Sequence, residues 1–260
     1  MSEHSSPDQT APETDDQTGG DADPTRFHRQ PLSFVRRGDR LTNRRQRAWD
    51  ELAPERILEV PREEHADRPV AERLQETSKP VGLLVNNAGF GLKTAFLDTD
   101  VEKEIASVDV MVKAVVVLSH AAGRAMRERG RGAIINVSSV AGFMASGTYS
   151  AAKSYVTVFS ESLAGQLAGT GVTVTALCPG FTHTDFHASA DIDVDKTSAI
   201  GKRLWLDADR LVRDCLADVD AGRVISVPGK QYKVATQLLR HVPRSIVRAG
   251  ALSNRHRPRD

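Results

Sequence analysis

A tyrosine and a lysine stand four residues apart, as Tyr149 and Lys153, where the sequence pattern predicts a helix over about residues 148–168. Side chains at this spacing share one helix face, so the phenol and the ammonium project together. A neighbouring cation favours the phenolate and lowers the tyrosine pKa from about 10, which suits a general acid/base between a carbonyl and an alcohol. Because the same spacing is common on surface helices, the pair alone does not establish a site.

Two serines, Ser138 and Ser139, follow a predicted strand over residues 133–137. Ligands of open parallel sheets bind outside the carboxyl ends of the strands, so a hydroxyl there can donate to a substrate carbonyl oxygen. Either Ser138 or Ser139 could take this role. The competing interpretation is that the two serines merely open a turn.

Small residues and asparagines follow two other predicted strands. The sequence Asn-Asn-Ala-Gly at 86–89 comes after strand 81–85, and Pro-Gly-Phe-Thr-His-Thr at 179–184 comes after strand 172–177. Such residues let a flat ligand lie close to the backbone. His183 and His187 flank Asp185, but no further Cys/His cluster accompanies them, so we expect no metal site.

The elements that must position these residues alternate between strand and helix. We predict strands over 32–35, 57–60, 81–85, 133–137, 172–177 and 223–227. We predict helices over 39–52, 100–129, 148–168 and 206–221, and a further helix that follows strand 57–60 and ends at about residue 77. This alternation predicts an α/β fold with a doubly wound parallel sheet. The continuous apolar run at 81–85 is typical of a parallel strand that is covered on both faces.

The composition fits one soluble domain. A chain of 260 residues with 40% hydrophobic residues can bury one α/β core, and its net charge of +1 gives no sign of nucleic-acid binding. Two cysteines form no disulfide framework, and the N-terminus lacks the pattern of a signal peptide, so we expect a cytoplasmic protein. The most apolar stretch, 110–123, contains Lys113 and is shorter than the ~20 residues that span a bilayer.

The two ends of the chain differ in charge. Residues 1–25 carry seven acidic side chains and no Lys or Arg, so we predict a disordered acidic segment over 1–31, ahead of a folded domain over 32–235. Residues 236–260 form a basic segment, in which six arginines between 240 and 259 alternate with aliphatic residues. A solvated tail or an oligomer contact is the preferred interpretation, and contact with an anionic membrane surface is the alternative.

Four blocks together resemble the short-chain dehydrogenase/reductase family: NNAG at 86–89, SS at 138–139, YSAAK at 149–153 and PGFTHT at 179–184. The resemblance covers roughly residues 33–230 and implies a Rossmann-like fold and a nicotinamide cofactor. It implies that Tyr149 is the catalytic acid/base and that Ser139 orients the substrate carbonyl. It also implies that Lys153 lowers the tyrosine pKa and holds the nicotinamide ribose.

The resemblance further implies where the cofactor lies. Asn86, Ala88 and Gly89 would line its adenosine side. Thr184 and the backbone near Thr182, in the turn that begins with Pro179 and Gly180, would hold the nicotinamide carboxamide. Arg36 lies where NADP-preferring members place a base for the 2′-phosphate, so NADP is expected rather than NAD. A homo-oligomer is expected by the same resemblance.

The sequence departs from the family pattern at three places. Ser139 and Tyr149 are only ten positions apart, fewer than in many members, so Ser138 is an alternative to Ser139. The family begins with a strand, a glycine-rich T-G-x-x-x-G-x-G turn and a helix that bind the pyrophosphate, and here only Thr18-Gly19-Gly20 resembles that turn. Without this unit, the strand at 83–85 would have an unpaired edge. Met111 falls at the position of the family's catalytic asparagine, and a thioether cannot donate the hydrogen bond of an amide.

These observations predict an oxidoreductase that interconverts a carbonyl and an alcohol with NADP, acting on an unidentified small molecule. The alternative is an inactive remnant of the family, with an interaction role or none.

Overall fold

The computed structural model of the chain describes residues 67–92, 94–184, 204–243 and 245–247. These residues all belong to the larger of two compact units, Asn43–Asp260. Outside the described residues lie the acidic segment 1–31, the predicted elements at 32–35, 39–52 and 57–60, Arg36, and the pair Asp185 and His187.

The described strands form one parallel sheet in the order β1-β2-β3-β4. Their bounds are β1 Leu83–Asn86, β2 Gly132–Val137, β3 Val172–Leu177 and β4 Ile225–Ser226. Each of the four strands overlaps a strand predicted from the sequence. The register aligns Asn86 with Asn136 and Asn136 with Ala176, so the carboxyl ends of β1, β2 and β3 meet at one edge of the sheet.

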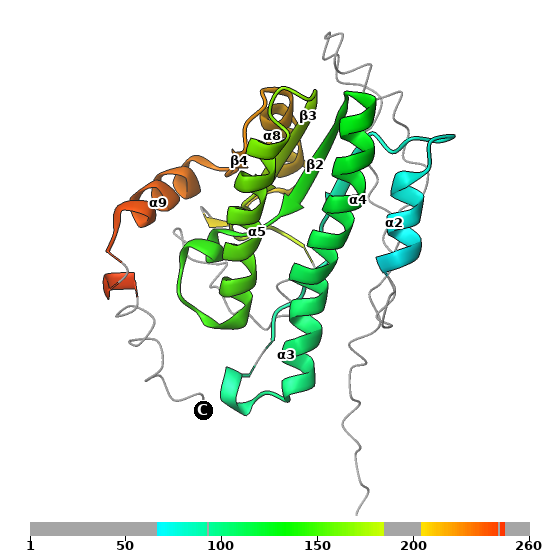
Figure 1. Cartoon of the computed structure of the whole chain (residues 1–260). Coiled ribbons are helices and arrows are strands. Elements are labelled where there is room, and N and C mark those ends of the chain that lie inside the picture. Colours follow the sequence, from blue (N-terminus) through cyan, green and yellow to red (C-terminus); the bar gives the residue numbers. More distant parts are fainter. Residues whose placement is uncertain (1–66, 93, 185–203, 244, 248–260) are drawn as a thin grey trace, which may run out of the picture. The chain divides into compact units, whose positions relative to one another are not determined.

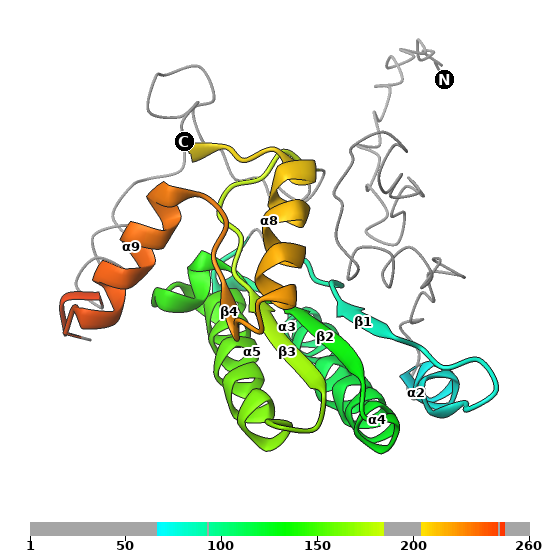
Figure 2. The same cartoon turned by 90° about the horizontal axis from the view of Figure 1, so that it is seen from above.

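Helices cover both faces of this sheet, which confirms the predicted doubly wound α/β fold (Figures 1 and 2). The α-helices are α2 Asp67–Gln75, α3 Val101–Val108, α4 Ala114–Arg129, α5 Gly147–Gln166, α8 Ala208–Asp220 and α9 Lys230–His241. Short 3₁₀ turns are η1 Phe96–Asp98 and η3 Val140–Phe143, and η2 Asp109–Lys113 is a π-helical turn.

The alternation of side chains along β2 divides the core between the two faces. Ile134 packs with Leu84, Val174 and the α4 residues Leu118 and Met126. Its neighbours Ala133 and Ile135 point to the opposite face, where they pack against α8 through Leu211, Cys215 and Val219. A strand that is apolar on both faces reads as a continuous apolar run, which is why the sequence identified it so clearly.

The outer edge of β1 carries no further strand within the described residues. Val85, in the middle of β1, is 48% exposed although its strand is largely apolar. This is the edge at which the family's first strand would pair.

The segment Val101–Arg129 was predicted as one helix, and it forms a continuous helical rod through α3, η2 and α4 (Figure 1). Asp100 caps its start by accepting a hydrogen bond from the Glu102 amide, and Gly130 ends it with φ of 70°. With a mean hydropathy of 1.7 over its most apolar window, the rod is long and apolar enough to cross a membrane. Here, however, Val115, Leu118 and Met126 are buried, and α4 packs on the sheet as a core helix does.

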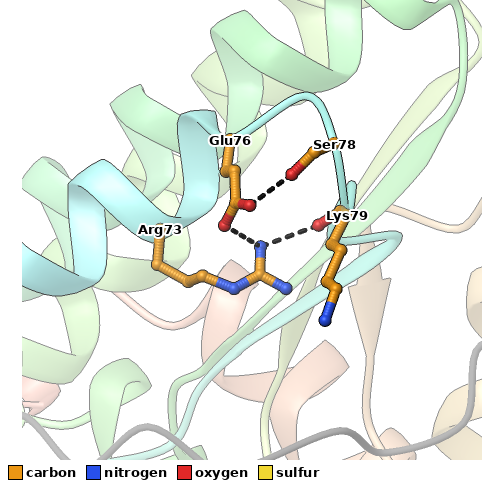
Figure 3. Close-up of polar contacts among 4 residues, drawn as sticks. All are labelled: Arg73, Glu76, Ser78 and Lys79. Carbon is orange, nitrogen blue, oxygen red and sulfur yellow. Dashed lines mark hydrogen bonds and ion pairs between the residues drawn. The ribbon is translucent and has the colours of Figure 1, made fainter.

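The entry into β1 is held by contacts from two helices. Near the end of α2, Arg73 donates to the Lys79 carbonyl at 2.7 Å and pairs with Glu76 at 3.7 Å (Figure 3). In the turn that follows, Ser78 donates to Glu76. From the end of α4, Arg129 donates to the Val81 carbonyl at 2.6 Å. These contacts fix the direction in which the chain enters the sheet.

Candidate active site

The carboxyl end of β2 leads into a tight turn that returns the chain to α5. Ser139 caps this turn, η3, by accepting a hydrogen bond from the Ala141 amide at 3.1 Å. Gly142 packs on the backbone of α5, where a Cβ atom would stand 2.9 Å from the Lys153 carbonyl carbon. Glycine at this position therefore allows the close packing that brings the first turn of α5 beside Ser139.

The turn brings the three predicted catalytic side chains together. The Tyr149 side chain is hydrogen-bonded to the Ser139 side chain. The Lys153 Nζ atom lies 5.7 Å from the centroid of the Tyr149 ring. One phenol, one hydroxyl and one amine thus converge where β2 ends and α5 begins.

Lys153 is buried, with 4% of its surface exposed, and its Nζ donates to the Val137 carbonyl at 2.8 Å. Burial lowers the pKa of Lys153 to about 8, because desolvation disfavours the ammonium. Two other elements reach the same point. A Cβ atom on Gly89 would stand 3.4 Å from Lys153 Nζ and 3.4 Å from the Met111 Sδ. Met111, fully buried in the π-helical turn η2, thus lies in the immediate surroundings of the lysine.

The expected lowering of the Tyr149 pKa is wrong for the structure. Burial raises the pKa of Tyr149, and the hydrogen bond with Ser139 offsets this only in part. The expectation rested on the charge of Lys153, and burial disfavours that charge as well. The phenol is therefore held protonated.

Ser138 has surroundings that differ from those of Ser139. It is buried, and its Oγ donates to the Lys153 carbonyl at 2.7 Å and is hydrogen-bonded to the Thr157 hydroxyl at 2.7 Å. These contacts fasten the end of β2 to α5. Because Ser139 is hydrogen-bonded to Tyr149, the geometry favours Ser139 as the group that meets substrate.

The side chain of Asn86 lies in a buried polar network. Its amide nitrogen donates to Ser119 at 3.1 Å and to the Asn136 carboxamide oxygen at 2.8 Å. Asn136 in turn donates to Ser160 at 3.0 Å, so the network joins β1 and β2 to α4 and α5. Ala88 is exposed and Gly89 is half-buried. Of the three predicted adenosine-side residues, Ala88 and Gly89 leave room beside the sheet edge.

The turn after β3 is packed against α9 by a residue that the sequence reasoning missed. Tyr232 accepts a hydrogen bond from the Phe181 amide at 3.0 Å and donates to the Leu204 carbonyl at 2.6 Å. Its ring lies so close to Gly180 that a Cβ atom there would stand 2.0 Å from the ring. Gly180 was predicted to let a ligand lie close to the backbone, but on this side the Tyr232 ring occupies that space. No local signal marks Tyr232, which lies 51 residues beyond Phe181.

The other predicted residues of this turn follow from the same packing. Thr182 is buried in a parallel bridge with Leu206, and its hydroxyl donates to the Gly180 carbonyl at 3.0 Å. Thr184 is exposed at the edge of the described residues. The ring of His183 stacks on Trp205 at 4.8 Å.

The described residues fit one end of a nicotinamide dinucleotide. Gly89 lets the backbone after β1 approach the Lys153 amine closely, since a Cβ atom there would stand 3.4 Å from Nζ. Within the same residues, no glycine-rich turn follows a strand of the sheet, so the groups that would bind a pyrophosphate are not among them.

Comparison with known proteins agrees with this arrangement. The family model for short chain dehydrogenase matches residues 57–195. Sulfoacetaldehyde reductase 2 of Chromohalobacter salexigens is 37% identical over 160 residues, which cover 56% of this chain and 63% of that protein. The 3-oxoacyl-[acyl-carrier-protein] reductase of Synechocystis is 37% identical over 125 residues, covering 47% and 50%. The chain thus spans between half and two thirds of the length of these two relatives.

A solved structure has the same fold. The short-chain dehydrogenase from Sphingobium yanoikuyae in complex with NADPH matches 76% of this chain and 74% of its own, with 26% identity and a TM-score of 0.60. The four sequence blocks, the parallel sheet and the family model lead to one conclusion: this chain belongs to the short-chain dehydrogenase family.

Proposed function

We propose that the chain is an oxidoreductase that interconverts a carbonyl and an alcohol with a nicotinamide cofactor. The observation that carries the proposal is the convergence of Tyr149, Ser139 and Lys153. The Tyr149 hydroxyl is bonded to Ser139, and the Lys153 amine lies 5.7 Å from the tyrosine ring.

The side chains divide the proton chemistry between them. When bound, the cofactor supplies or accepts the hydride. Ser139 donates a hydrogen bond to the substrate oxygen, and Tyr149 transfers its phenolic proton to that oxygen during reduction. Because burial raises the pKa of Tyr149, the phenol is protonated near neutral pH and is set up as the acid for reduction. Lys153 lies beside the phenol and would hold the ribose end of the cofactor.

NADP is the cofactor we propose, with NAD as the weaker alternative. The Sphingobium relative binds NADPH, and a short-chain dehydrogenase from Burkholderia cenocepacia, 23% identical, was solved in complex with NADP. In this chain, Arg36 would bind the 2′-phosphate, since a guanidinium matches phosphate geometry with two parallel hydrogen bonds. Ala88, Gly89, Pro179, Gly180, Thr182 and Thr184 would line the remainder, with Asn86 contributing through its backbone.

The substrate class stays open within carbonyls and alcohols. The two relatives named above act on different molecules, sulfoacetaldehyde and a 3-oxoacyl group carried by a protein, according to their names. Because relatives of equal identity differ in substrate, neither substrate is transferred to this chain.

Replacement of Tyr149 by Phe tests the proposal. It removes the transferable proton and leaves the ring, so kcat/KM for NADPH-dependent reduction of a broad aldehyde panel should fall about 10²- to 10⁴-fold. The dissociation constant for NADPH, measured by fluorescence titration, should change little. Tyr155→Phe on the exposed side of α5 is the matched control and should keep full activity. Equal activity in the Tyr149 variant would refute the assignment.

We further propose a homo-oligomer that forms through α3 and α5. These two helices expose apolar side chains that association of two copies would remove from water: Val101, Ile105, Val108, Tyr155 and Val158. Tyr155 and Phe159 stack with ring centroids 5.8 Å apart, so the two aromatic side chains support each other on this surface. Light scattering coupled to size exclusion should show an assembly that Ile105→Asp together with Val158→Asp converts to monomer. An unchanged mass would refute this interface.

A further inference from the structure

Helix α9 has one face that packs on the fold and one that does not. Tyr232 and Thr236 are buried, and Arg240 lies 5.3 Å from the ring of Phe143 in η3. Two residues further along the helix from each buried position, and so on the opposite face, Val234 is 61% exposed and Leu238 is 64% exposed. Figures 1 and 2 show α9 on the β4 side of the sheet, on the far side from α2 and α4.

The outward face of α9 is apolar along its centre. Val234 and Leu238, with Lys233 and Gln237, line a shallow surface hollow of about 420 Å³. Ile246, in the helical turn that follows at 245–247, is 61% exposed as well. Three aliphatic side chains turned to water on one terminal stretch are more than the scattered exposure of an ordinary surface.

The charge of this part of the chain has one sign. Residues 221–259 contain nine Lys and Arg and no Asp or Glu, although the whole chain has a net charge of only +1. On α9 itself, Lys230 and Lys233 border the aliphatic residues of the outward face. A helix with aliphatic side chains bordered by lysines lies in the interface of an anionic bilayer, and its affinity combines apolar burial with attraction to the lipid headgroups.

We propose that the outward face of α9 docks on an anionic lipid surface. Val234 and Leu238 enter the boundary between headgroups and acyl chains, and Lys230 and Lys233 contact the lipid phosphates. A second copy of this face is a poor occupant, because it would place identical positive charges against each other. An acidic protein with an apolar patch is the competing occupant, and vesicle binding distinguishes it from a lipid surface. The inference does not depend on the proposed catalytic function.

The test is cosedimentation of the full chain with vesicles at low salt. We expect binding to phosphatidylcholine vesicles that contain about one third phosphatidylglycerol, little binding to pure phosphatidylcholine, and release as the salt concentration rises. Lys230→Gln with Lys233→Gln should weaken partitioning roughly 25-fold, since each basic residue near such a surface changes it about fivefold. Val234→Ser with Leu238→Ser should also abolish most of the binding.

Matched controls show whether vesicle binding depends on the outward face of α9 or on any exposed charged or apolar side chain. Leu97→Ser removes a leucine that is 91% exposed on η1, and Lys103→Gln removes an exposed lysine on α3; both should leave vesicle binding unchanged. All the substituted side chains are exposed, so circular dichroism should show folded variants. Equal binding to neutral vesicles would overturn the proposal. Loss of binding in the lysine variant with full binding in the Val234/Leu238 variant would also overturn it, because it would indicate a soluble anionic partner.

Discussion

At the scale of single residues, the site is defined by how it excludes water from two titratable groups. Lys153 is buried with a lowered pKa, and Tyr149 is half-buried with a raised one. Both shifts favour the neutral form. The sequence predicted these two residues, with Ser139, from their spacing. It could not predict the direction of the tyrosine pKa shift, because that shift depends on burial in the folded chain.

The lysine makes the stability of the fold depend on pH. The pKa of Lys153 is about 8 in the folded chain, against 10.5 for an ordinary lysine. Above about pH 8 the unfolded chain keeps a proton that the folded chain has lost, so stability rises with pH, by at most about 1.4 kcal/mol per unit. Denaturant unfolding of the wild type and Lys153→Met should therefore differ increasingly in favour of the wild type from about pH 8 to about pH 10. A constant difference would contradict this.

The two serines at the end of β2 should separate stability from turnover. Ser138→Ala removes a buried hydroxyl bonded to the Lys153 carbonyl and Thr157, and should lower the free energy of unfolding by about 1–3 kcal/mol. Ser139→Ala should change that free energy less and should lower kcat more than the Ser138 variant does. Chemical unfolding and kinetics on both variants check this. The reverse pattern would show that Ser138 meets the substrate.

At the scale of elements, the sequence predicted the four strands and most helices of the described part because their apolar patterns are strong, but it did not predict α9. β3 has the predicted bounds, and α5 and α8 lie within two residues of theirs. The local sequence pattern could not show the π-helical turn η2, because the apolar periodicity continues through η2 from α3 into α4. Nor could it show the contact between α9 and the turn after β3, since Tyr232 and Gly180 meet only through the tertiary fold.

Tyr232→Phe tests whether α9 positions the turn that would meet the nicotinamide. The change removes one hydroxyl that links the Phe181 amide to the Leu204 carbonyl. Amide hydrogen exchange at Phe181 should accelerate, and the free energy of unfolding should fall by about 0.5–1.5 kcal/mol, since the part-buried Leu204 carbonyl loses its donor. Tyr155→Phe, at a half-exposed tyrosine, is the control. Exchange at Phe181 that matches the wild type would show that the hydroxyl does not hold the turn.

At the scale of the whole molecule, the described fold is a short-chain dehydrogenase sheet whose first strand-turn-helix unit is not among the described elements. Among the described strands none pairs with that edge of β1, and the sequence contains no T-G-x-x-x-G-x-G turn. The pyrophosphate of a dinucleotide needs backbone amides and a helix N-terminus. In the proposed site, Lys153 would hold the ribose end, so the two ends of the cofactor should contribute very unequally to its affinity.

Calorimetric titration of the purified chain with NADPH tests this account most directly. We predict that NADPH binds, that it binds more weakly than to the Sphingobium relative measured alongside, and that Lys153→Met abolishes the binding. NADH should bind more weakly still. Absence of any NADPH binding to the wild-type chain, or equal binding by Lys153→Met, would contradict the proposed site. Affinity as tight as that of the relative would show that the N-terminal residues supply the pyrophosphate contacts after all.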